Sequence, residues 1–91
     1  SQDKAKVLQI FAAAFKVDAD VCARWALIRF AARAAGEDAL SVMADMAAAD
    51  PRFQSDYQIF AQIYASGVVD FERVWLALPS QDPHGCLHRP D

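Results

Sequence analysis

Apolar side chains recur along the chain at the three- and four-residue spacing of amphipathic helices. In residues 3–16 they fall on one wide arc, opposite Lys6, Gln9 and Lys16. This pattern predicts an amphipathic helix. Its apolar arc consists of Val7, Leu8, Ile10, Phe11, Ala14, Phe15 and Val17.

A second helix is predicted up to Ala35. Asp18 or Asp20 supplies an N-cap oxygen at its start, and Gly36 favours the left-handed conformation that follows many helices. Apolar side chains occupy two sides of this helix, which is typical of a helix packed between neighbours or shared with a second subunit.

Three shorter helices are predicted at about 38–49, 51–65 and 68–78. Residues 79–91 hold three of the four prolines and show no apolar periodicity, which is typical of an irregular tail. The sequence thus predicts an all-α fold, a compact bundle of four or five short helices in residues 1–78, with an irregular Pro-rich C-terminal tail in residues 79–91.

The composition indicates more apolar side chain than one small bundle hides. A domain of 91 residues buries only about 60–65% of the surface that its unfolded chain exposes. The hydrophobic fraction is 55%; 19 residues are alanine, but six Phe, two Trp and two Tyr are also present. We expect part of this surface to face another polypeptide, and we predict a homodimer built on the second or the fourth helix.

The formal net charge of −3 hides a difference between the two halves. Residues 1–36 carry six Lys or Arg against three Asp, a balance of +3, and residues 37–91 carry three Arg against nine acids, a balance of −6. The halves are expected to attract each other, within one molecule or across a dimer. An acidic chain repels phosphate backbones, which argues against nucleic acid as the main ligand.

The two cysteines, Cys22 and Cys86, are 64 positions apart and form no C-x-x-C pair. We expect free thiols in a reducing cytosol, with a long-range disulfide as the alternative. The sequence shows neither an apolar run long enough for a membrane helix nor a signal-peptide pattern, so a cytoplasmic location is expected. The alanine-rich, arginine-over-lysine composition suggests a bacterial source.

Candidate chemistry is sparse. His84, Cys86 and His88 offer two imidazoles and a thiol, but their alternate spacing in a proline-flanked segment without a fourth ligand is not a structural zinc pattern. Ser41 and Ser66 lack a nucleophile elbow, and the three glycines form no phosphate-binding motif. We therefore predict no catalytic residue, no metal, no cofactor and no enzymatic activity.

A DNA-binding helix-turn-helix is an alternative. Ala32, Gly36 and Val42 have the spacing of a small residue, a turn glycine and a core β-branched residue. The recognition helix would be residues 38–49, which contain two aspartates and no Lys, Arg, Asn or Gln to meet base edges or phosphates. Contact with DNA would then use another face, such as that of Arg24, Arg29 and Arg33.

The favoured function is that of a small regulatory protein acting by stoichiometric protein-protein binding, for example an antiactivator that sequesters a transcription factor or blocks its dimerisation. A secretion or assembly chaperone is a further alternative. Four aromatic residues of the fourth helix recur at spacings of four, three and four, and either core packing or a partner explains them. The expected partner-binding residues are Trp25, Arg29, Arg33, Phe53, Tyr57, Phe60 and Tyr64.

Overall fold

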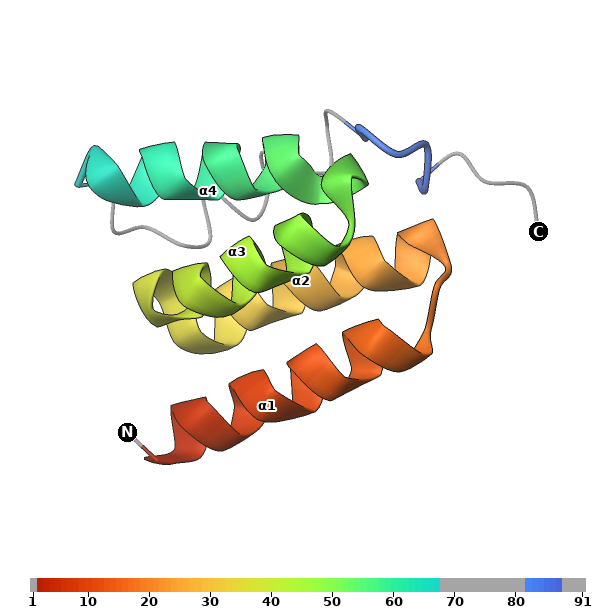
Figure 1. The fold of residues 1–91 in the computed structure, drawn as a ribbon. Coiled ribbons are helices and arrows are strands. Elements are labelled where there is room, and N and C mark those ends of the chain that lie inside the picture. The colour runs from red at the N-terminus through yellow and green to blue at the C-terminus, as the bar shows by residue number, and fades with distance from the viewer. Residues whose placement is uncertain (1, 68–81, 88–91) are drawn as a thin grey trace.

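The computed structural model describes residues 2–67 and 82–87 (Figure 1). Its elements, in order, are α1 (Gln2–Val17), α2 (Val21–Ala35), the 3-10 helix η1 (Gly36–Ala39), α3 (Leu40–Ala49), the 3-10 helix η2 (Pro51–Phe53) and α4 (Gln54–Ala65). No strand occurs in these residues. The expectation of a compact all-α fold is thus confirmed.

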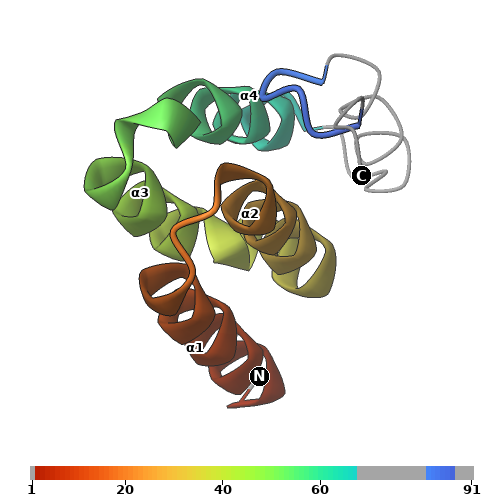
Figure 2. The same cartoon turned by 90° about the vertical axis from the view of Figure 1, so that its right-hand side faces the viewer.

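Helices α2 and α3 occupy the middle of the molecule, with α1 on one side of them and α4 on the other (Figures 1 and 2). α1 packs against α2 and α3, and α4 packs against α3. The helices that α1 packs against all lie on one side of it. Its opposite side, which we call the outer side, faces away from the other described helices.

The expected four or five separate helices are not found in the described residues, which instead form three unbroken helical segments at 2–17, 21–49 and 51–65. The chain reverses inside the second segment, at Gly36, whose φ of 56° lies in the left-handed region that glycine adopts without steric cost. The turn between α2 and α3 is the 3-10 helix η1. The helix expected at 68–78 lies outside the described residues, as does the expected domain boundary.

Aspartate side chains fix where two of the helical segments begin. Asp20 accepts a hydrogen bond from the backbone nitrogen of Ala23 at 3.0 Å, so Asp20 is the N-cap of α2. Asp18 instead accepts one from the backbone nitrogen of Asp20, also at 3.0 Å. Asp50 caps η2 by accepting from the backbone nitrogen of Arg52 at 3.2 Å. The starts of α2 and η2 are thus set by aspartates that directly precede them in the sequence.

One apolar core lies between the helices. Phe15 of α1 and Phe53 of η2 meet edge to face, with their ring centroids 5.9 Å apart. Full burial of a side chain of this kind contributes about 1.5–3 kcal/mol to stability. Three alanines of α2, Ala31, Ala32 and Ala35, belong to this core. The buried apolar residues are Leu8, Phe15, Trp25, Ile28, Ala31, Ala32, Ala35, Ala39, Met43, Met46, Ala47, Phe53 and Phe60.

A disulfide joins Cys22 to Cys86, so the expectation of two free thiols is wrong. Cys22 lies in the first turn of α2, and residues 82–87 are an irregular series of turns, drawn in blue in Figure 1. The two Cα atoms are 5.5 Å apart despite a sequence separation of 64. The two cysteines meet because residues 82–87 fold back onto the start of α2.

Candidate protein-binding surface

Three of the seven expected partner-binding residues lie in the core. Trp25, Phe53 and Phe60 are 2%, 0% and 1% exposed. Their rings pack inside the molecule. For Phe53 and Phe60 this is the core-packing explanation of the aromatic spacing. A direct contact with a partner would require this core to open.

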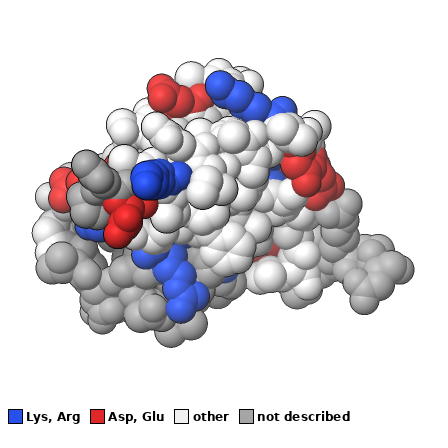
Figure 3. Space-filling model, turned by 90° about the horizontal axis from the view of Figure 1, so that it is seen from below, with Lys and Arg blue, Asp and Glu red and all other residues white. Residues whose placement is uncertain are grey.

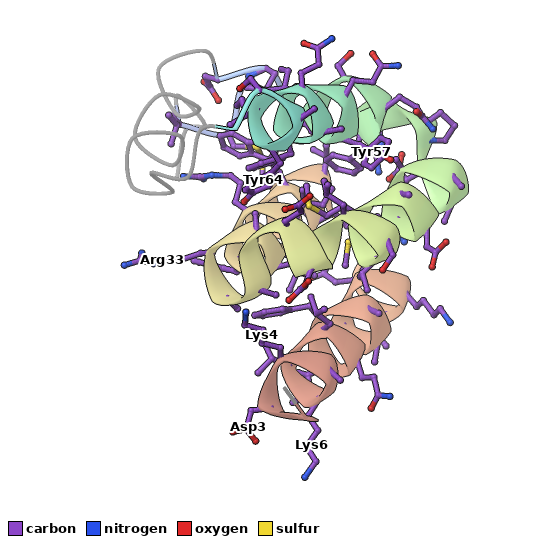
Figure 4. All side chains as sticks on the ribbon, turned by 90° about the vertical axis from the view of Figure 1, so that its left-hand side faces the viewer. Asp3, Lys4, Lys6, Arg33, Tyr57 and Tyr64 are labelled. Atoms are coloured by element: carbon purple, nitrogen blue, oxygen red, sulfur yellow. A yellow bond between two sulfur atoms is a disulfide. The ribbon has the colours of Figure 1, made fainter. Side chains whose placement is uncertain are left out.

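The other four residues lie nearer the surface. Tyr57, Tyr64 and Arg29 are half-buried, and Arg33 is exposed. Figure 4 shows both tyrosines pointing from α4 toward the bundle and Arg33 pointing away from it. Arg24 is also half-buried, so Arg33 is the exposed member of the three arginines considered for DNA binding.

The structure brings Arg29 and Trp25 together. The guanidinium carbon of Arg29 lies 4.4 Å from the centroid of the Trp25 ring, within the range of a cation–π interaction. Burial lowers the pKa of Arg29, because removal from water disfavours the charged form. This pair therefore works as an internal contact of α2.

Tyr64 is packed less favourably. Its ring stacks on that of Phe60 with the centroids 6.5 Å apart, but its buried hydroxyl has no hydrogen-bond partner among the described residues. Burial raises the pKa of Tyr64, and the negative charge of Glu37 raises it further. A buried hydroxyl left without any partner costs about 1–3 kcal/mol, and among the described residues the Tyr64 hydroxyl has none.

The outer side of α1 carries an apolar stripe that the described residues leave uncovered. Ile10 and Val17 are 66% and 86% exposed, and Ala13 between them is also exposed. Ile10 follows the core residue Leu8 by two positions, and Val17 follows the core residue Phe15 by two. Two residues turn a helix by about 200°, so the exposed and buried side chains point in nearly opposite directions. We call Ile10, Ala13 and Val17 the outer stripe.

Sequence reasoning missed the outer stripe because it treated the apolar positions of this helix as one wide arc. Only a narrower arc around Leu8 and Phe15 packs into the core. On the helical wheel, Ile10 and Val17 lie far from the direction of Leu8 and Phe15, and this angle was the signal that separates exposed from buried apolar residues.

Lysines flank the outer stripe. Lys6 lies one turn before Ile10 on the same face, and Lys16 lies beside Val17; both lysines are exposed. Figure 3, which looks at the α1 side of the molecule, shows a largely uncharged surface with charged side chains toward its margins. An uncharged centre with a charged rim is typical of a protein-binding surface.

A hollow of about 310 Å³ lies between α1 and α3, on another side of α1 from the stripe. Its lining includes the buried Phe15 and Met46, while the exposed Lys16 and Asp45 bring opposite charges from the two helices. This volume lies at the lower end of the range of ligand pockets. We call this hollow the α1–α3 groove; it is lined by Ala12, Phe15, Lys16, Val42, Asp45, Met46 and Ala49.

The motif of His84, Cys86 and His88, from which no metal site was predicted, makes other contacts in the structure. His84 pairs with Asp56, Cys86 is bonded to Cys22, and His88 lies outside the described residues. Within residues 2–67 and 82–87 no group of three or more His, Cys, Asp or Glu is arranged to hold a metal ion. In that same part of the chain, every helix is too short or too polar to cross a lipid bilayer.

Comparison with protein-family models, with curated proteins and with solved structures finds no match to this chain.

Proposed function

We propose that this protein acts by stoichiometric binding of another protein, through the outer stripe and through the α1–α3 groove on another side of the same helix. The observation that carries the proposal is the exposure of Ile10 and Val17, 66% and 86%, on a helix whose opposite face is built into the core. Large apolar side chains aligned on a surface helix are unfavourably hydrated, and burial against a partner removes that cost.

The α1–α3 groove favours a helical segment of the partner. Phe15 and Met46 give its lining apolar surface, and Lys16 and Asp45 contribute one positive and one negative charge. An amphipathic helix binds such a groove with its apolar side chains inside and its charges at the rim. The specific role we propose is that of a regulator, such as an antiactivator that sequesters a transcription factor or blocks its dimerisation.

A second copy of the chain is the competing occupant of this surface. In a two-fold dimer, Lys16 of each copy would face Asp45 of the other copy, which makes the groove self-complementary in charge. A homodimer was expected on the second or fourth helix, whereas α1 carries the more exposed apolar side chains, Ile10 and Val17.

A cytoplasmic location also belongs to this proposal, although the Cys22–Cys86 disulfide weighs against it, because disulfides persist mainly in oxidising compartments. Alkylation of thiols in intact source cells, followed by mass measurement, distinguishes the two cases. Two alkylated cysteines support a reducing compartment, and an unmodified disulfide contradicts it.

Affinity capture from a native lysate tests the proposed surface. The bait is the wild-type chain beside the double variant Ile10→Gln, Val17→Gln, which removes the apolar stripe with a residue that keeps helix propensity. Because these side chains are exposed, we expect the double variant to keep the wild-type melting temperature and to lose the captured protein.

Phe30→Gln is the matched control, since Phe30 is an apolar side chain of α2 that is 45% exposed. It should retain the same captured protein at the same stoichiometry. Equal capture by all three baits contradicts the proposal, and capture of nucleic acid instead of protein favours the DNA-binding alternative. Light scattering on the same samples identifies a homodimer, and capture of many unfolded clients would favour a chaperone.

A further inference from the structure

Residues 82–87 form a short strap across the ends of other elements, and we call them the C-terminal strap. Two hydrogen bonds fold the strap on itself: Asp82 accepts from the backbone nitrogens of Gly85 and of Leu87, each at 3.1 Å. Since both bonds lie inside the strap, they hold its shape but do not hold it to the bundle. Other contacts must do that.

The first such contact is His84, which fills a slot between three elements. Its Nε2 atom lies 2.9 Å from Oδ2 of Asp56 in α4, and its ring centroid lies 4.8 Å from that of Phe53 and 6.0 Å from that of Trp25. The side chains of His84 and Asp56 are only 11% and 4% exposed. The strap therefore covers two aromatic rings and a carboxylate.

The second contact is the Cys22–Cys86 disulfide, which ties the strap to the first turn of α2. Both cysteines are half-buried, and Cys86 packs against the edge of the core. The disulfide thus attaches the strap covalently to α2.

Most of the core is built from residues outside the strap. The buried core residues that the structure describes all lie between Leu8 and Phe60, and Cys86 only packs against their edge. A short segment at the edge of the core can open locally while the rest of the fold stays intact.

We propose that the Cys22–Cys86 disulfide is a redox latch that keeps the slot of Trp25, Phe53 and Asp56 occupied by His84. A dithiol transfers two electrons and two protons to the disulfide; the S–S bond breaks, two thiols form, and the dithiol becomes a disulfide. The strap is then held by non-covalent contacts alone and leaves the slot. Reduction thus uncovers aromatic surface next to a carboxylate, independently of the surface on α1.

Amide hydrogen exchange of the full chain, followed by NMR at Gly85 and Leu87, tests the latch. Oxidised protein is compared with protein reduced by dithiothreitol and with the double variant Cys22→Ser, Cys86→Ser. Exchange at these two amides should accelerate at least about tenfold in both reduced forms, while amides of α1 to α4 keep their protection. The variant His84→Ala, measured oxidised, should show a smaller acceleration because the covalent link is intact.

Two results would overturn the latch. Equal exchange of the Gly85 and Leu87 amides in oxidised and reduced protein shows that the strap stays in place without the disulfide. Loss of protection throughout the helices on reduction shows that the disulfide supports the whole fold, so that no separate strap is released. If the double cysteine variant fails to fold because of its serines, wild-type protein reduced by dithiothreitol decides: strap amides that stay protected in it contradict the proposal.

Discussion

The guanidinium of Arg24 lies 2.9 Å from the carboxylate of Asp50, although 26 residues separate them. Arg24 also donates through Nε to the backbone oxygens of Phe15 at 3.0 Å and of Asp18 at 2.8 Å. Arg52 reaches the same carboxylate with two further bonds of 2.9 and 2.7 Å. One aspartate, only 6% exposed, therefore helps to join the end of α1, the start of α2 and the junction between α3 and η2.

Replacement of Asp50 should destabilise the fold. Asp50→Asn keeps the shape of the side chain but removes the charge that Arg24 and Arg52 contact, and a buried hydrogen bond to a charged group is worth about 1.5–3 kcal/mol. Urea denaturation should show a loss of this order. Asp45→Asn, at an exposed position of α3, is the control and should change the free energy of unfolding by less than about 0.5 kcal/mol.

The same aspartate predicts acid sensitivity. The hydrogen bonds from Arg52, and then that from Arg24, hold the pKa of Asp50 well below its ordinary value. A carboxyl whose pKa is depressed by folding stabilises the protein above its unfolded pKa of about 3.9, and this contribution is lost as the pH falls toward the folded pKa. Below about pH 5, the free energy of unfolding should thus fall more steeply for wild type than for Asp50→Asn. Parallel slopes would contradict this role.

Phe53 should behave as a core residue. It is 0% exposed and packs against Phe15 and His84, so Phe53→Ala should cost about 3–5 kcal/mol in the free energy of unfolding. Phe30→Ala, at a position 45% exposed, should cost less than about 1 kcal/mol. Similar losses from both variants would show that burial of Phe53 is not what stabilises the junction of η2 and α4.

Tyr64→Phe should raise stability, by about 1 kcal/mol, because it removes a buried hydroxyl that has no hydrogen-bond partner among the described residues. Absorbance titration of tyrosinate in the variant Tyr57→Phe isolates Tyr64, since the chain has two tyrosines. The burial that raises the pKa of Tyr64 should place this titration above the ordinary value of about 10.

Burial of Tyr64 also predicts how the stability of the protein changes at alkaline pH. The pKa of Tyr64 is higher in the folded chain than in the unfolded one, so its contribution is complete below about pH 10 and is lost as the pH rises through the folded pKa. The wild type should therefore lose stability above about pH 10, and Tyr64→Phe should lose less. A titration of Tyr64 at or below the ordinary pKa would contradict the burial.

The sequence by itself determined where most helical segments begin and end. Asp20 and Asp50 cap the segments that follow them, and Gly36 marks the reversal before α3, because these effects arise between residues at most a few positions apart. Amphipathic spacing likewise sufficed for an all-α fold, since helical periodicity is a local property of the chain.

Only the tertiary structure decided which apolar side chains are hidden and which distant residues meet. Ile10 and Leu8 look alike in the sequence, yet only Leu8 faces α2 and α3, because burial depends on where the neighbouring helices lie. The same holds for Arg24 with Asp50 and for Cys22 with Cys86, whose spacings carry no local signal. Contacts of this kind form when the whole chain packs, so no short stretch of residues encodes them.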